Sequence, residues 1–293
     1  MPFFTIDGRP LHYIVRGSGE PVLLIHGLGS SGADWDFQVP PLEKQFRVVV
    51  PDLPGCGHSS QGDRGYSVAA AAQALWTLLD SLGIPSPNVV GFSFGGAVAL
   101  EMALQRPAAV PCLILINSLA SYRLDHWRKW LEARVPAVLV RGLGMRRTAR
   151  LVSLRLFPHP WQQSMRERAQ RVIAEVPSAT YLGMARALER WCASDRLHLL
   201  RSRITLIAAE FDYTPLIEKR SLARRLAATL VIVRGSRHGT PFDSIEVTNA
   251  ILLAALTDQP LPPPDCWQSD PPERTPTSQM PRSIAEEHAS VLS

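Results

Sequence analysis

The chain lacks the residue patterns that build metal centres, disulfide frameworks and membrane spans. Its 293 residues include four cysteines, Cys56, Cys112, Cys192 and Cys266. They are widely scattered and form no CxxC pair, so neither a zinc site nor a set of disulfide bonds is expected. The apolar runs, such as Val22–Ile25, are far too short to cross a bilayer, and we expect no integral membrane segment.

Signals for cofactors and for export are missing as well. The sequence has no glycine-rich phosphate-binding loop, and no cofactor is expected. Residues 1–8 have no basic start, no long apolar stretch and no cleavage site, so no signal peptide is expected. The predicted compartment is therefore the reducing cytoplasm. A hydrophobic content of 46% and a charged content of 19% are typical of a globular protein.

Positive charge is concentrated in one part of the chain. The net charge is +5, but residues 119–196 carry 15 Arg or Lys against 6 Asp or Glu. This excess predicts an arginine-rich surface, which is either merely solvated or attracts an anionic substrate or an acidic carrier protein. Nucleic acid is not an expected partner, because no binding motif accompanies the charge.

Short apolar runs alternate with stretches of helical periodicity. The runs predict strands at Val22–Ile25, Val48–Val50, Val89–Phe92, Cys112–Ile116, Ile204–Ala208 and Leu230–Val233, preceded by a hairpin of Thr5–Asp7 and Leu11–Val15. Helices are predicted at Val68–Leu82, Phe94–Gln105, Leu216–Ala227 and Glu246–Leu256. Because such alternation requires crossover connections, we predict an α/β fold with a mostly parallel, doubly wound sheet.

The alternation stops in the middle of the chain and again near its end. We predict a core made of residues 3–117 and 203–256, with a helical insertion, 118–202, that forms a lid over one end of the sheet. Residues 257–293 contain 8 of the 25 prolines and few aliphatic residues. That composition predicts a mostly disordered tail.

The segment Gly91-Phe92-Ser93-Phe94-Gly95 joins a predicted strand to a predicted helix. A serine at such a turn, with glycine two residues away on either side, is typical of a nucleophile elbow. Glycine fits beside the crowded serine backbone, and the sharp turn lifts the hydroxyl clear of the sheet. We therefore predict Ser93 as a nucleophile. The alternative, an ordinary helix-capping serine, does not explain the flanking glycines.

Four further segments occur at the order and spacing found in one large family. They are Leu24–Gly29 (LIHGLG), Pro51–Ser59 (PDLPGCGHS), Phe211–Pro215 (FDYTP) and Gly235–His238 (GSRH). Together with the serine turn they resemble the α/β-hydrolase superfamily over residues 3–256, and its serine esterases and lactonases in particular. The resemblance implies an α/β-hydrolase fold with a helical lid, and a catalytic triad in the chain order serine, acid, histidine.

The predicted triad is Ser93, Asp212 and His238. His238 follows a strand on a loop, where its imidazole could take the serine proton, and Asp212 would hold that imidazole in the correct tautomer. The rival candidates for the acid are Asp125, Glu210 and Asp243. Asp125 is the strongest rival, because some relatives place the acid after the preceding strand.

The oxyanion hole is predicted to consist of the backbone amides of Leu28 and Phe94, next to glycines that let the loop bend towards the serine. His26 is expected to tie this loop together rather than to transfer protons. The residues predicted to line the acyl pocket are Leu28, Trp35, Phe94, Trp127 and Trp130. The alternative for the aromatic residues is a purely structural place in the insertion core. Cys56 is expected to be an unreactive thiol.

These patterns together predict a serine hydrolase that cleaves a carboxylic ester, thioester or lactone through an acyl-enzyme on Ser93. The expected substrate is a small molecule, or an acyl group linked to a carrier protein that binds the basic lid at Arg146 and Arg147. The resemblance leaves open a carbon–carbon bond hydrolase or a perhydrolase of the same fold. A ligand-sensing protein that retains the triad is the alternative from another class.

Overall fold

The part of the chain that the structure describes contains an eight-stranded, mostly parallel sheet. This computed structural model describes residues 2–6, 8–60, 65–122 and 127–261, except for the side chains of 127–137. The strands are β1 (Phe3–Ile6), β2 (Arg9–Arg16), β3 (Glu20–Ile25), β4 (Phe46–Pro51), β5 (Asn88–Phe92), β6 (Cys112–Ile116), β7 (Arg203–Ala209) and β8 (Thr229–Val233). They lie in the order β1-β2-β4-β3-β5-β6-β7-β8. The two pairings of β2 are antiparallel, and all pairings from β4 to β8 are parallel.

Helices form most of the connections. The α-helices are α1 (Val39–Leu42), α2 (Val68–Ser81), α3 (Phe94–Gln105), α4 (Trp127–Leu156), α5 (Gln163–Glu175), α6 (Ser178–Arg190), α7 (Leu216–Leu226), α8 (Thr240–Asp243) and α9 (Ile245–Leu256). Short 3₁₀ helices are η1 (Gly32–Trp35), η2 (Pro160–Gln162) and η3 (Ser194–Leu199). Ser67 caps α2, because its hydroxyl accepts a hydrogen bond of 3.0 Å from the amide of Ala70. A kink divides α4 at Gly144, whose φ is 73°.

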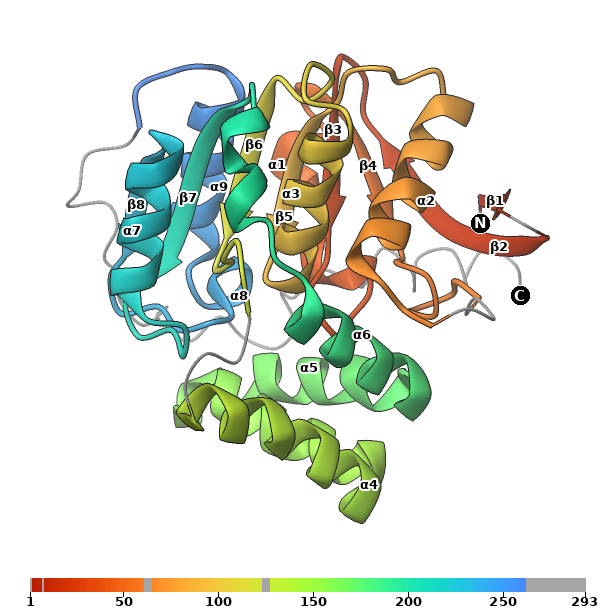
Figure 1. The fold of residues 1–293 in the computed structure, drawn as a ribbon, viewed down its shortest axis with the longest axis vertical. Helices are drawn as coiled ribbons and strands as arrows, with labels where there is room; N and C mark the ends of the chain where they lie inside the picture. Colours follow the sequence, from red (N-terminus) through yellow and green to blue (C-terminus); the bar gives the residue numbers. More distant parts are fainter. Residues whose placement is uncertain (1, 7, 61–64, 123–126, 262–293) are drawn as a thin grey trace.

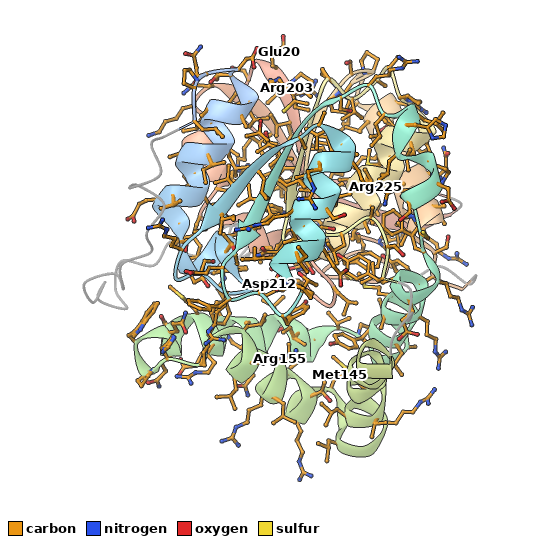
Figure 2. The ribbon with its side chains drawn as sticks, turned by 60° about the vertical axis from the view of Figure 1, so that its left-hand side comes forward. Glu20, Met145, Arg155, Arg203, Asp212 and Arg225 are labelled. Atoms are coloured by element: carbon orange, nitrogen blue, oxygen red, sulfur yellow. The ribbon has the colours of Figure 1, made fainter. Side chains whose placement is uncertain are left out.

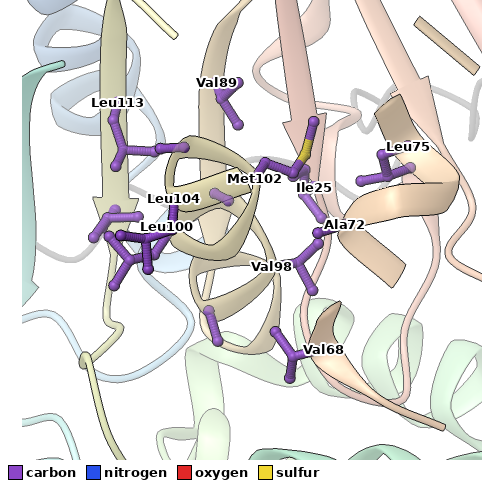
Figure 3. Close-up of a cluster of buried hydrophobic side chains, with 14 of the residues drawn as sticks. Ile25, Val68, Ala72, Leu75, Val89, Val98, Leu100, Met102, Leu104 and Leu113 are labelled. Atoms are coloured by element: carbon purple, nitrogen blue, oxygen red, sulfur yellow. The ribbon is translucent and has the colours of Figure 1, made fainter. Parts of the chain in front are cut away.

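Both faces of the parallel sheet are buried, which explains the continuous apolar runs of its strands. In β3, Leu23 and Ile25 point to the face covered by α2, α3 and α7. Val22 and Leu24 point to the other face, where α1 and α9 pack. Figure 3 shows the first cluster, in which Val98 and Met102 of α3 pack between the sheet and α2. This packing fixes α3, and with it the turn that precedes α3, against the centre of the sheet.

Helices α4, α5 and α6 form a separate layer beyond one end of the sheet (Figure 1). They have their own small apolar cluster, which includes Met145 and Ile173. The layer is tied to the core at several points: for example, the indole of Trp191 donates a hydrogen bond of 2.8 Å to Glu101 on α3. No helix in the described ranges is both long enough and apolar enough to cross a membrane.

The predicted α/β architecture is confirmed, and most predicted elements lie within one or two residues of the observed ones. Helix α3 and strand β6 have the predicted bounds. The short helices α1 and α8 were not predicted. The division into a core and a lid at residues 118–202 stays a prediction, and residues 262–293 of the predicted tail lie outside the described residues.

Candidate active site

Ser93 lies at the sharp turn between β5 and α3, in a backbone conformation that few residues adopt. Its φ is 53° and its ψ is −113°, so a non-glycine residue is held under strain here. The turn is so tight that it has no room for side chains at the neighbouring glycines. A Cβ atom on Gly91 would overlap the backbone of Gly95, and one on Gly95 would overlap the carbonyl oxygen of Ile25. The amide of Ser93 donates to the carbonyl of Ile116 on β6 at 2.8 Å. The close packing therefore presents the hydroxyl at the carboxyl end of the sheet.

The structure brings Ser93, His238 and Asp212 together. The Nε2 atom of His238 lies 2.8 Å from the hydroxyl of Ser93, and its Nδ1 atom lies 2.7 Å from Oδ1 of Asp212. All three side chains are buried. Because Nδ1–H donates to the carboxylate, Nε2 of the neutral ring is free to accept the serine proton. Three groups that are far apart in the sequence thus form the geometry of an activated serine.

The second oxygen of Asp212 is held by two neighbours. It accepts a hydrogen bond of 2.5 Å from the hydroxyl of Thr214 and forms an ion pair with the buried ammonium of Lys219. Burial alone would raise the pKa of Asp212, but the charges and hydrogen bonds of His238 and Lys219 lower that pKa far below its usual value. The carboxylate therefore stays ionised wherever His238 would act as a base.

The rival acids have other partners. Glu210 accepts a hydrogen bond of 2.9 Å from the amide of Gly235. Asp243 accepts hydrogen bonds from the Ser236 hydroxyl at 2.7 Å and from the Arg237 amide at 2.8 Å, and so shapes the loop that leads to His238. Burial raises the pKa of Asp243. The third rival, Asp125, lies outside the described residues.

Asn117, which the sequence analysis did not single out, fixes the histidine loop to the sheet. It follows β6 and adopts a positive φ of 49°. Its amide nitrogen donates to the carbonyl of His238 at 2.8 Å and to the hydroxyl of Thr240 at 2.7 Å, and its amide oxygen accepts from Ala209 at 2.7 Å. The position of Asn117 at the end of a predicted strand could have marked it as a candidate site residue. Its hydrogen-bond partners could not be predicted, because they depend on the order of the strands in the sheet.

Tyr213 is a second group that sequence reasoning missed. Its hydroxyl lies 2.7 Å from Nε2 of His238, so it shares that atom with Ser93. The centroids of the tyrosine and histidine rings are 4.1 Å apart. Tyr213 lines the same space as Ser93 and His238. Tyr213 therefore borders the position where a reacting group would approach Nε2.

The loop after β3 is held in place close to Ser93. The Nδ1 atom of His26 donates to the carbonyl of Gly27 at 2.8 Å, and its Nε2 accepts from the amide of Leu53 at 2.9 Å. The amide of Gly27 donates to the buried carboxylate of Asp34 at 2.9 Å. Both ring nitrogens of His26 are thus used for structure. Leu28 follows on this loop and, like Ser93, lines a cavity.

That cavity has a volume of about 340 Å³ and lies between the ends of the strands and helices α4 to α6. Its apolar lining includes Leu28, Phe92, Leu119, Phe157, Met165 and Phe242. Two residues expected in the pocket are not on its wall. Trp35 and Phe94 are fully buried in the two core clusters, because their helices turn these side chains towards the sheet. The side chains of Trp127 and Trp130 lie outside the described residues.

Cys56 is buried, and its sulfur lies 3.5 Å from the sulfur of Met184 on α6. Burial, with smaller effects from Asp52 and Asp34, raises the pKa of the Cys56 thiol, so the thiolate does not form near neutral pH. The prediction of an unreactive thiol agrees with this placement.

One group in the described ranges has the donor set for a metal. His12, Asp52 and His58 place their ligand atoms within 4.8 Å of one another. The carboxylate of Asp52, however, already accepts hydrogen bonds from Nδ1 of His12 at 2.8 Å, the amide of His58 at 2.9 Å and the amide of Gly32 at 2.7 Å. This arrangement ties the loop after β4 to its surroundings, and none of the three residues lines the cavity.

Comparison with known proteins identifies the family. A family model described as the alpha/beta hydrolase fold matches residues 20–241, so the chain belongs to the α/β-hydrolase family. The resemblance found in the sequence motifs is thereby confirmed.

Several curated relatives, two of which are described here, carry the name "Putative carbamate hydrolase RutD". The protein from Stutzerimonas stutzeri is 30% identical over 263 residues, covering 85% of this chain and 97% of the relative. The protein from Variovorax paradoxus is 37% identical over 174 residues, covering 58% of this chain but only 63% of the relative's length. Among solved structures, a thermophilic esterase from Thermogutta terrifontis is 26% identical with a TM-score of 0.74, covering 87% of this chain and 96% of the esterase.

Proposed function

We propose that the protein is a serine hydrolase that cleaves a carboxylic ester, thioester or lactone of a small molecule. The observation that carries this proposal is the chain of contacts from the Ser93 hydroxyl to Nε2 of His238, at 2.8 Å, and from Nδ1 to Asp212, at 2.7 Å. A serine hydroxyl is a weak nucleophile near neutral pH unless a base takes its proton. This arrangement supplies the base and the carboxylate that orients it.

In the first half of the reaction, Oγ of Ser93 attacks the carbonyl carbon while Nε2 of His238 takes the hydroxyl proton. The carbonyl oxygen becomes an oxyanion, which the amides of Leu28 and Phe94 stabilise. Loss of one such donor typically costs on the order of 3 kcal/mol in the transition state. The bond to the leaving alcohol or thiol then breaks, and His238 returns the proton to that leaving group. An acyl-enzyme remains on Ser93.

In the second half, water approaches the position next to Nε2 that the leaving group has vacated. His238 takes a proton from this water, whose oxygen attacks the acyl carbon. Collapse of the second oxyanion releases the carboxylic acid and restores the Ser93 hydroxyl with the proton held by His238. Tyr213 borders this position, with its hydroxyl 2.7 Å from Nε2.

Helices α4 to α6, within the predicted insertion 118–202, are proposed to act as a lid that excludes water and shapes the acyl site. Support comes from the cavity, which is lined both by residues around the triad, such as Leu28 and Phe242, and by residues of these helices, such as Leu156 and Met165. A cytoplasmic location stays a prediction from the sequence.

Carbamate hydrolysis is a second candidate, favoured by the name of the relative that aligns over 97% of its length. The same serine attack on a carbamate carbonyl would form a carbamoyl-enzyme. The carbon–carbon hydrolase, perhydrolase and ligand-sensing alternatives have no specific contact in their favour.

The test compares the native protein with Ser93→Ala on a panel of esters, thioesters, lactones and carbamates with short and long acyl chains. We expect multiple turnovers by the native protein and a loss of at least about a thousandfold in kcat for the variant. Thermal unfolding of both proteins controls for folding. Near-normal turnover by a folded Ser93→Ala variant would refute the mechanism, and the best substrate on the panel distinguishes the ester and carbamate candidates.

A further inference from the structure

Arg155 on α4 brings a positive charge to the cavity in front of the triad. It lines the cavity, and its guanidinium carbon lies 5.0 Å from the centroid of the Tyr213 ring. The centroid of that ring lies 4.1 Å from the centroid of the His238 ring. Figure 2 shows Arg155 on the helical layer below Asp212, on the side that faces the ends of the strands. The guanidinium is therefore one tyrosine ring away from the base.

The other charged residues that line the cavity already have partners. They are Asp34, Arg168, Glu189 and Glu218. Asp34 accepts from the amide of Gly27 and from the hydroxyl of Ser30, and Arg168 forms an ion pair with Asp36. Glu189 and Glu218 each have an interaction of their own. In the described ranges Arg155 pairs with no carboxylate, and its contact is the aromatic face of Tyr213.

The helix that carries Arg155 adds to the positive field at this end of the molecule. Residues 138–156 of α4 contain five arginines and no acidic residue. Arg146, Arg147 and Arg150 are exposed, as is Arg155, but only Arg155 of the four lines the cavity. Clustered charge of one sign beside a low-dielectric cleft raises the local concentration of oppositely charged small molecules. An anion is thus drawn towards the helix on which Arg155 lies.

We propose that the natural substrate carries a second, negatively charged carboxylate group, which Arg155 binds while Ser93 attacks the ester or lactone carbonyl. This inference rests on the proposed function. Arg155 is exposed and lines the cavity, so its planar guanidinium is accessible to a substrate and can donate two parallel hydrogen bonds to a carboxylate. Arg155 then selects anionic over neutral acyl compounds of the same shape.

The experiment uses matched ester pairs of similar shape and different charge, and each enzymatic rate is compared with the hydrolysis rate of the same ester without enzyme. One pair places the charge on the leaving group: 4-carboxyphenyl butyrate and 4-carbamoylphenyl butyrate. The other places it on the acyl group: 4-nitrophenyl hydrogen glutarate and its amide analogue. For the native protein, kcat/KM should be about tenfold or more higher for the charged member of at least one pair, as expected for a charged bidentate contact. Arg155→Gln should abolish this preference, so that kcat/KM for the charged ester falls to that of its neutral partner in the same variant.

The matched control is Arg150→Gln, another exposed arginine of the same helix, which should keep the preference because Arg150 does not line the cavity. Activity on the neutral esters shows that each variant is folded. The inference is overturned if the native protein has no charge preference or if Arg155→Gln keeps it. Ser93-dependent hydrolysis of neutral esters in that case leaves the proposed function intact. If the native protein hydrolyses no ester of either pair, both proposals fail for these substrates.

Discussion

At the scale of single residues, the two carboxylate oxygens of Asp212 bind different neighbours. One oxygen orients His238, and the other is bound by Lys219 and Thr214. Lys219 is 2% exposed, and burial lowers its pKa while the charge of Asp212 opposes that change. An ion pair of this kind adds little net stability over an apolar pair, but removal of one partner leaves a buried charge without compensation.

Replacement of Lys219 by methionine tests this coupling. At pH 7 we expect Lys219→Met to lower the free energy of unfolding by roughly 3 kcal/mol, since the buried Asp212 loses its counter-charge. The pKa of Asp212 is strongly depressed in the folded state, so its contribution is fully present above the unfolded value of about 3.9 and is lost progressively as the pH falls from there through the folded-state pKa. The difference between the two proteins should therefore begin to shrink near about pH 4 and continue to shrink as the pH falls to about 2.

Urea unfolding at several pH values measures this difference. Lys44→Met is the control, because Lys44 is exposed and its loss should change stability by less than about 0.5 kcal/mol. An equal destabilisation of Lys219→Met at pH 7 and at about pH 2 would show that Lys219 acts through packing rather than through its charge.

At the scale of elements, the position of Ser93 depends on how closely α3 approaches the sheet. Gly95 has no room for a side chain, since a Cβ atom there would overlap the carbonyl oxygens of Ile25 and His26. Those backbone atoms belong to β3 and the loop that follows it, which cannot move without disturbing the centre of the sheet.

Gly95→Ala should therefore destabilise the protein by about 1–3 kcal/mol through overpacking, and should lower turnover by displacing the serine turn. Gly142 on α4 is the matched control, because nothing lies within 4 Å of a Cβ atom there. Gly142→Ala should leave stability unchanged or raise it by up to about 1 kcal/mol. Thermal unfolding of the two variants gives the comparison, and equal effects would contradict the packing argument.

The sequence predicted best those helices and strands whose ends are marked by residues within or next to the element itself. Helix α3 and strand β6 have the predicted bounds because continuous apolar residues and turn residues mark their ends. The contacts of Asn117 and Lys219 could not be predicted, since they depend on β6 and β7 lying next to each other. Trp35 was expected in the pocket from its type, but the direction of its side chain follows from the packing of η1 against the sheet.

At the scale of the whole molecule, the cavity exists only because the layer of α4, α5 and α6 stays attached to the core. One attachment lies at the cavity itself, where Arg168 of α5 forms an ion pair with the buried Asp36 and donates to the carbonyl of Ala33 at 2.9 Å. Another lies directly after α6, where the indole of Trp191 donates a hydrogen bond of 2.8 Å to Glu101 on α3. The two attachments thus hold two different helices of the layer.

Loss of the first attachment should loosen this layer without disturbing the sheet. In Arg168→Gln we expect backbone amides of α5 to exchange with deuterium about tenfold faster or more, because hydrogen bonds to charged groups contribute about 1.5–3 kcal/mol. Amides of β5 and α3 should exchange as in the native protein, since their protection comes from the two core clusters. Arg171→Gln, an exposed change on the same helix, is the control. Faster exchange throughout the sheet would instead mean that the layer and the core unfold as one unit, and unchanged exchange in α5 would mean that apolar contacts alone hold the layer in place.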